Sequence, residues 1–447
     1  LHYPLRRQRQ MCIRDSFLLI INFITPLALL GSWNVQKSNW QFQIQMLLLQ
    51  IGMLGCFAAM DVVLFYVFFE VMLIPMYLLI GIWGGSNRLY ATIKFFLYTF
   101  FGSLLMLVAL LYTANIYMDL NGVWSFSVLD WYGMDIPVDT QYWLFIGFAA
   151  AFAVKIPLFP LHTWLPDAHY EAPTAGSVQL AAVLLKFGPY GFLRFAMPVF
   201  PAAVYELSTF FIVLALIGII YGGMVAMVQP QIKRLIAYSS VAHMGYIVMG
   251  LFALNIQGLY GSWIQMINHA IVTGALFLVV GMIYERTHTQ EISDYGGVAH
   301  TMPKFAAFLI FFSMASIGLP GLNGFVGEVL AMIGAARVNI WYGIIAAFGV
   351  LIAAIYMLWM VQRVVFGPLT KEMVKRLNDF TLREVVVLVP LVFWTIFLGV
   401  YPQPFFERIE VSINHYIQLI KSQEPRFAQD EAESPGLTKF LVWNLEE

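Results

Sequence analysis

The chain has 447 residues, of which 60% are hydrophobic and only 11% are charged, and its mean hydropathy is +0.77. A soluble globule of this size would need far more polar surface, so the composition predicts a protein that lies in a bilayer. The formal net charge of −1 argues against a nucleic-acid partner, because a polyanion requires a basic surface.

The first sixteen residues, LHYPLRRQRQMCIRDS, are basic and polar, and they precede an apolar run without the cleavage site of a secretory signal. We interpret residues 1–16 as a non-native or truncated start. Because about twenty apolar residues cross the hydrocarbon, residues 17–402 form a transmembrane domain of about twelve spans. The spans begin near residues 16, 43, 61, 92, 141, 175, 207, 233, 258, 305, 340 and 384. Residues 403–447 are expected to form an amphipathic surface helix and a polar tail.

These spans are predicted to be helices, because an unpaired backbone group in lipid costs several kcal/mol and the alternation of a barrel is missing. Basic residues then orient them, since Lys and Arg concentrate in cytoplasmic loops. They fall at the ends of every second connection: Lys37, Arg88, Lys94, Lys233, Arg234, Arg286, Lys304, Arg363, Lys371, Lys375, Arg376 and Arg383. The opposite connections are poor in positive charge, and on this pattern the basic start lies on the wrong side.

Two spans contain helix-breaking residues in the middle of a hydrophobic run. Span five, FAAAFAVKIPLFPLHTWLPDAH, holds Pro157 and Pro160, which lack backbone donors. Span ten, FFSMASIGLPGLNGFVGEVLAMIG, is interrupted by glycines and Pro320. An offset of five spans reverses the direction of the chain. The pattern therefore predicts a helix bundle with two inverted five-helix repeats, about 43–196 and 207–366, as in transporters.

Five titratable residues lie deep in the predicted membrane domain. Glu70 is roughly 15 Å into its span, and Lys186 and His269 are similarly central. Lys155 precedes the first break, and Glu328 follows the second. A charge at the bilayer centre costs about 2.5–3.5 kcal/mol, so these groups are expected to face a hydrated interior.

A static ion pair between Glu70 and Lys155, fixing only helix register, is the alternative interpretation of two such charges. A series of five favours proton transfer instead. A buried lysine suits the storage and release of a proton, because a neighbouring carboxylate stabilises a charge that apolar surroundings disfavour. His269 and His243 are weaker candidates, since a histidine in a helix is commonly a packing residue.

The motifs of cofactor sites are missing from the sequence. Cys12 and Cys56 lack the spacing of a metal or iron–sulfur site, and neither a GxGxxG with an acidic partner nor a GxxxxGKS occurs. We therefore expect that the chain itself binds no cofactor and no metal.

Four segments resemble the antiporter-like membrane subunits of complex I, and most closely the subunit M or chain 4 type, from about residue 17 to about residue 405. The segments are FFEVMLIPMYLLIGIWGG, FAVKIPLFPLHTWLPDAHYEAPTAGSVQLAAVLLK, IKRLIAYSSVAHMGY and GLPGLNGFVGE. The resemblance implies fourteen family helices, so the spans seen here would be the third to the fourteenth.

The resemblance also implies roles for residues that match family positions. Glu70 is the carboxylate that pairs with the broken-helix lysine, Lys155. Lys186 is the central relay lysine, and Glu328 is the exit-side carboxylate, where sister subunits usually carry lysine. Asp61 matches a further acidic position at the start of the Glu70 helix.

The implied function is proton translocation in a bacterial inner membrane, coupled to electron transfer from NADH to quinone in other subunits. Flavin, iron–sulfur clusters and quinone are then expected in those partners, which include sister antiporter-like subunits. The same fold occurs in cation/proton antiporter complexes and membrane-bound hydrogenases, which remain alternatives. A passive structural anchor is a third interpretation, and it predicts that the mid-membrane charges are dispensable.

Overall fold

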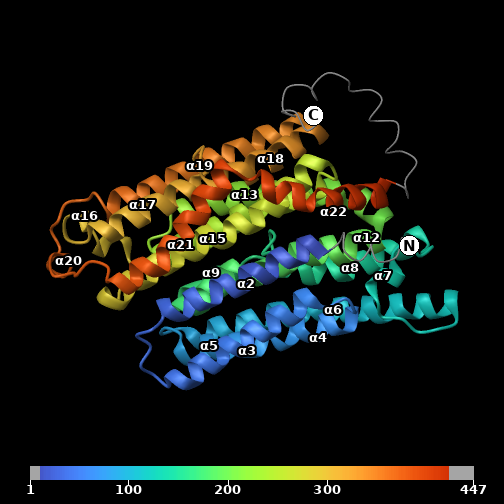
Figure 1. Cartoon of the computed structure of the whole chain (residues 1–447), viewed down its shortest axis with the longest axis horizontal. Coiled ribbons are helices and arrows are strands. Elements are labelled where there is room, and N and C mark those ends of the chain that lie inside the picture. Colours follow the sequence, from blue (N-terminus) through green and yellow to red (C-terminus); the bar gives the residue numbers. More distant parts are fainter. Residues whose placement is uncertain (1–10, 422–447) are drawn as a thin grey trace.

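The apolar segments of the chain form long helices that lie side by side (Figure 1). The computed structural model describes residues 11–421, and within this range there is no β-strand, only two isolated β-bridges. The prediction of an all-α fold is therefore confirmed. Residues 1–10 and 422–447, which hold most of the predicted foreign start and the polar tail, lie outside the described residues.

The helices follow one another through short connections. The first group is α2 (Met11–Gly31), α3 (Asn39–Ala58), α4 (Val62–Val71), α5 (Leu73–Trp83), α6 (Arg88–Asn121), α7 (Val128–Trp131), α8 (Val138–Lys155) and α9 (Trp164–Glu171). The second group is α10 (Thr174–Ala182), η1 (Leu184–Lys186), α11 (Phe187–Gly191), η2 (Phe192–Ala196), α12 (Met197–Val199), α13 (Pro201–Met227), α14 (Ile232–Phe252) and α15 (Ile256–Thr287). The third group is η3 (Ile292–Asp294), α16 (Val298–Thr301), α17 (Pro303–Ile317), α18 (Asn323–Val338), α19 (Ile340–Val364), α20 (Glu372–Lys375), α21 (Leu382–Val400) and α22 (Gln403–Lys421).

Ten helices in the described part of the chain are long and apolar enough to cross a membrane. The two other spans expected from the sequence, near residues 141 and 305, are the paired half-helices α8/α9 and α17/α18. Helix α2 begins at Met11, five residues before the start expected from the sequence, so residues 11–16 belong to this helix.

Both broken spans are interrupted where prolines and glycines stand. Helix α8 ends at Lys155, and α9 begins at Trp164 after a segment that contains Pro157 and Pro160. Helix α17 ends at Ile317 and is followed by Gly318, whose φ of +82° is left-handed and therefore favours glycine. Residues 318–322, called the second break below, include Pro320 and separate α17 from α18.

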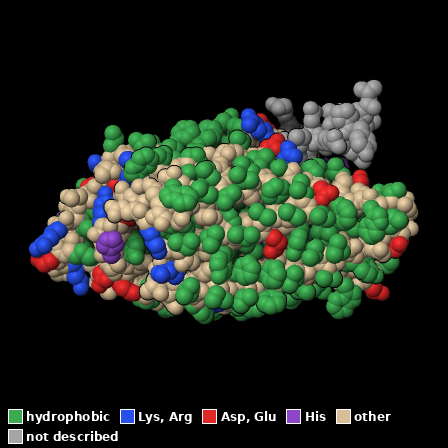
Figure 2. Space-filling model, turned by 90° about the horizontal axis from the view of Figure 1, so that it is seen from below, with side chains coloured by type: hydrophobic (Ala, Val, Ile, Leu, Met, Phe, Trp, Pro, Cys, Tyr) green, Lys and Arg blue, Asp and Glu red, His purple; other side chains and the backbone are tan. Residues whose placement is uncertain are grey.

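The helices divide into a buried centre and an apolar periphery. Helix α15 is buried throughout its apolar stretch, and α14 and the 174–199 span are nearly so. In α3, α6, α19 and α21, less than half of the apolar stretch is buried. Figure 2 shows hydrophobic side chains across the middle of one face and most of the visible Lys and Arg at the end where Figure 1 places α16 and α20. This apolar belt with a basic end is the surface expected of a membrane protein.

The two isolated bridges repeat one hydrogen-bond pattern at opposite ends of the molecule. Asp61 pairs with Ser127 near α7, and Gln231 pairs with Glu291 near α16 (Figure 1). In each case the residue after one bridge position donates to the residue before the other. The bonds are Val62 N to Phe126 O (2.8 Å), Val128 N to Met60 O (3.1 Å), Ile232 N to Gln290 O (2.9 Å) and Ile292 N to Pro230 O (2.8 Å).

Candidate functional site

Lys155 is the last residue of α8, and only 1% of it is exposed. Its ammonium makes no hydrogen bond to another described side chain or carbonyl, and it lies 4.8 Å from the centre of the Phe69 ring and 5.7 Å from that of Phe95. Aromatic faces attract a cation but leave its three donors unused. The lysine is thus held at the first break without a fixed proton acceptor.

Glu70 lies at the end of α4, one turn from the start of α5. Its carboxylate forms no ion pair with the Lys155 ammonium within 4.0 Å, and its Oε1 has no hydrogen-bond partner among the described residues. The static ion pair considered from the sequence is therefore not formed in this conformation. The separation leaves room for a change in the distance between the two charges.

Lys186 lies in an irregular turn at the centre of the bundle. The chain leaves the α10 helix at Val183 and makes the 3₁₀ turn η1, where the Lys186 Nζ donates to the Ala181 carbonyl oxygen at 2.5 Å. The same ammonium is 2.6 Å from His269 Nδ1 on α15, and Lys186 is completely buried. The lysine and the histidine are therefore in direct hydrogen-bond contact, the arrangement that proton transfer requires.

Glu328 on α18 contacts His243 on α14. Their Oε1 and Nδ1 atoms are 2.7 Å apart, and the other imidazole nitrogen of His243 is 3.1 Å from Ser316 Oγ. The rings of His243 and His269 are adjacent, with centroids 5.9 Å apart. His243 thus connects the carboxylate to the His269 side of the cluster.

A small cavity of about 10 Å³ lies between these two contact pairs and has room for a single water molecule. Its walls include both histidines, Glu328 and three uncharged polar residues of α15, Gln265, Asn268 and Thr273. The Nε2 atom of His269 has no hydrogen-bond partner among the described residues. Four of the five predicted mid-membrane residues therefore lie in the buried interior. Two of them, His269 and Glu328, line this cavity together with His243, and Lys186 contacts His269.

The connection from Lys155 to Lys186 is through adjoining backbone and not through a direct side-chain contact in the described part of the chain. Gly188, two residues after Lys186, packs against α8: a Cβ added to it would overlap the Ile156 side chain and lie 2.6 Å from the Phe152 carbonyl. The two lysines therefore stand on helix ends that touch each other.

The other predicted positions lie outside this cluster. Asp61 caps α4, where its carboxylate accepts from Leu64 N at 2.9 Å, and it also belongs to the bridge with Ser127. Pro157 and Pro320 lie in the two breaks. Gln265 was not singled out from the sequence, yet it donates to Glu328 Oε1 at 3.0 Å. An uncharged amide in an apolar helix gives little sequence signal, because it carries no charge penalty.

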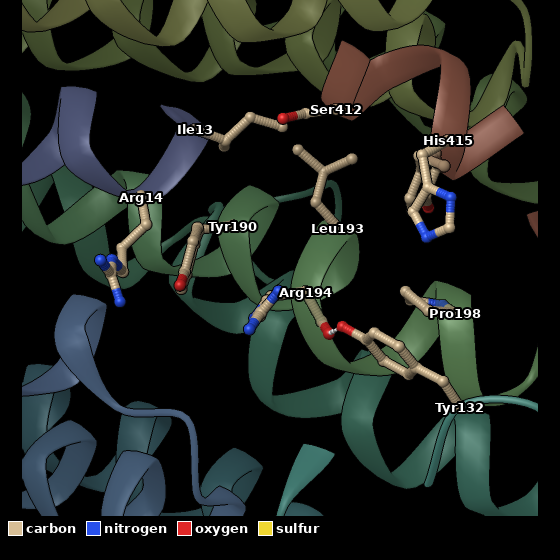
Figure 3. A pocket seen from close by; sticks show the side chains of 10 residues that line it. Ile13, Arg14, Tyr132, Tyr190, Leu193, Arg194, Pro198, Ser412 and His415 are labelled. Atoms are coloured by element: carbon tan, nitrogen blue, oxygen red, sulfur yellow. Dashed lines mark hydrogen bonds between the residues drawn. The ribbon is translucent and has the colours of Figure 1, made fainter. Parts of the chain in front are cut away.

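A larger cavity, of about 50 Å³, lies near α12 and α22 and is lined by none of the five predicted residues (Figure 3). Arg14, Arg194 and His415 line it, and Arg14 is paired with Asp15 at 3.0 Å. The Tyr132 hydroxyl donates to the carbonyl of Arg194, as the dashed line in Figure 3 marks. Among the described residues, we find no group of three or more His, Cys, Asp or Glu side chains that could hold a metal ion.

Comparisons with known proteins place this architecture. The profile of the family described as "NADH:quinone oxidoreductase/Mrp antiporter, TM" matches residues 59–355. NADH-quinone oxidoreductase subunit M of Rhodobacter capsulatus is 49% identical over 411 residues, covering 90% of this chain and 80% of the relative. NADH-ubiquinone oxidoreductase chain 4 of Marchantia polymorpha is 41% identical over 404 residues, with coverage of 90% and 80%.

Solved structures agree with the sequence comparisons. A chain of respiratory complex I from Thermus thermophilus has a TM-score of 0.84 and 34% identity, over 92% of this chain and 85% of that chain. A chain of the Mrp complex from Dietzia has a TM-score of 0.79 over 91% of this chain and 85% of that chain, but with 18% identity it shows the fold alone. The chain therefore belongs to the membrane-subunit family of NADH:quinone oxidoreductases and Mrp antiporters.

Proposed function

We propose that this chain is the proton-moving, antiporter-like subunit of an NADH:quinone oxidoreductase in a bacterial inner membrane. The observation that carries the proposal is the buried pair of contacts from Lys186 to His269 and from His243 to Glu328, at 2.6 Å and 2.7 Å. The names of the relatives support the parent enzyme, since they are subunits M and chains 4 of such oxidoreductases.

In this proposal a proton moves along the membrane interior in four steps. A change in the separation of Glu70 and Lys155 alters how strongly the lysine holds its proton. The proton passes through water to Lys186, then to His269, and by way of His243 to Glu328. Release on the opposite face returns Glu328 to its carboxylate form. Each later donor regains a proton from the group before it, and Lys155 regains one from water on the entry side.

The proposal assigns the redox chemistry to other subunits. Flavin, iron–sulfur clusters and quinone would reside in partner subunits, and sister antiporter-like subunits would flank this one in the membrane. This assignment agrees with the lack of nucleotide and cluster motifs in the sequence.

We also propose that the two bridges at opposite ends of the molecule belong to two inverted five-helix units, about 43–196 and 207–366. In the first unit, Asp61 precedes the second helix, which begins with α4, and pairs with Ser127 in the loop after the third helix, α6. In the second unit, Gln231 precedes the second helix, α14, and pairs with Glu291 in the loop after the third helix, α15. Units of opposite direction would place their breaks facing each other near the middle of the membrane.

Substitution of Lys155 or Glu70 by alanine tests the assignment directly. We expect NADH-driven proton uptake into inverted membrane vesicles to be abolished or sharply reduced in both variants, while the subunit remains inserted. Lys375→Ala is the control, because that lysine is 44% exposed and pairs with Glu372 at the surface. Normal pumping in both variants would rule out the proposed roles.

Copurification tests the parent complex. We expect iron–sulfur and flavin proteins to copurify with the chain under mild detergent. Their absence, together with sodium-dependent proton flux in vesicles, would instead favour a cation/proton antiporter, the alternative that the fold likeness to an Mrp complex allows.

A further inference from the structure

Gln265 is fixed against α18 by a close contact between helices α15 and α18. A Cβ added to Gly327 would overlap the Gln265 amide oxygen, and one added to Gly261 would overlap the backbone nitrogen of Ala331. Gly334 approaches Gly258 in the same way. Small residues therefore let α15 and α18 lie backbone to backbone, and Gln265 fills the position beside Glu328.

The orientation of the Gln265 amide is set by a neighbour on the same helix. Asn268 Nδ2 donates to the Asn323 carbonyl oxygen at 2.6 Å and faces Gln265 Oε1 at 3.5 Å. Because the amide oxygen faces this donor, the Gln265 Nε2 faces Glu328 and donates to Oε1 at 3.0 Å.

The two oxygens of Glu328 consequently have different surroundings. Oε1 is contacted by both Gln265 and His243. Oε2 lies toward the second break, where a Cβ added to Gly318 would be 3.2 Å from it. Both Gln265 and Glu328 are at most 3% exposed, so bulk water does not compete for the Oε1 contact.

We propose that Gln265 is a positioning residue that holds the unprotonated carboxylate of Glu328 against His243. A hydrogen bond to an ionised oxygen is roughly twice as strong as one to a neutral oxygen. When a proton passes from His243 Nδ1 to Oε1, the Gln265 bond weakens and the neutral carboxyl group is freed to turn toward the second break. There it gives the proton to water, and the resulting carboxylate returns to Gln265. This inference rests on the proposed role of Glu328. It adds a reason why Glu328 is protonated by His243 before it turns away and releases the proton.

The test compares Gln265→Met with Gln179→Met in the assembled complex. Methionine has a similar length but no N–H donor. Gln179 is a matched buried glutamine whose Nε2 donates to Thr25 Oγ1 and whose Oε1 has no hydrogen-bond partner among the described residues. We expect the rate of proton pumping to fall about tenfold in Gln265→Met, the effect of losing one hydrogen bond to a charged group. Gln179→Met is expected to pump normally.

Infrared difference spectroscopy provides a measurement that would not change if Gln265 had only a structural role. The carboxylate stretching band of Glu328, identified by its loss in Glu328→Gln, is expected to shift in Gln265→Met and to stay unchanged in Gln179→Met. An unshifted band with normal pumping in Gln265→Met would overturn the proposal, and so would an equal pumping loss in both methionine variants.

Two further variants separate the possible failures. If Glu328→Gln pumps normally, the proposed function itself fails; if it stops pumping while Gln265→Met does not, only the role of Gln265 fails. Should Gln265→Met not assemble, Asn268→Ala removes the donor that orients the amide. This variant is expected to shift the same band in the same direction, and an unshifted band would overturn the proposal.

Discussion

Among single residues, Glu384 and Glu372 offer the clearest contrast in stability. The Glu384 side chain is 2% exposed and accepts two hydrogen bonds from Arg286, at 2.7 Å and 2.8 Å. It also accepts a hydrogen bond from the backbone N–H of Thr381, the N-cap residue of α21, and so completes a capping box. Glu372 pairs with Lys375 and is 71% exposed.

We predict that Glu384→Ala destabilises the fold by about 3 kcal/mol, because it leaves the partly buried guanidinium of Arg286 without its carboxylate partner. Glu372→Ala is expected to cost less than about 1 kcal/mol, as exposed pairs do. The thermal midpoint of the purified protein in detergent measures both. Equal midpoints for the two variants would contradict this account.

The sequence located the charged residues of the site but not how they pair. Charged groups in apolar runs are conspicuous, which is why Lys186 and Glu328 could be predicted. The contact between His243 and Glu328 joins α14 to α18, and a sequence holds no distance between helices. Gln265 was not predicted as a site residue, because an uncharged amide in a helix is compatible with ordinary packing.

At the scale of elements, the breaks near Pro157 and Pro320 followed from residues that cannot continue a helix. The turn at Lys186 was not predicted, although Pro189 in LLKFGPYG is a signal for it. Its position depends on Gly188 packing against α8, a tertiary contact. Helix boundaries also differed from the expected ones, because helices such as α6 extend beyond the length that crosses the hydrocarbon.

Close approach of α15 and α18 leads to a prediction about glycines. Gly261→Ala places a methyl group onto the backbone of Ala331, and overpacking of this kind costs about 1–3 kcal/mol. Gly218→Ala is the control, since an added Cβ there meets nothing within 4 Å. We expect a lower thermal midpoint and weaker proton pumping only for Gly261→Ala. A midpoint at or above that of the unsubstituted protein would show that the two helices have room to separate.

Across the whole molecule, the most buried helices carry the polar centre, and the peripheral helices present apolar side chains. Composition alone predicted the membrane domain, but the order in which the polar groups meet depends on how α10, α14, α15 and α18 pack. Lys186, His269, His243 and Glu328 are therefore proposed to act as one functional unit. Residues of one unit show non-additive effects when they are removed together.

The most direct measurement is the number of protons pumped per NADH oxidised in vesicles that carry Lys186→Met, Glu328→Gln or both substitutions. If the groups form one path, each single variant loses the contribution of this subunit, and the double variant loses no more than either one. A double variant that pumps markedly less than both single variants, or a single variant that pumps at the full ratio, would contradict the account.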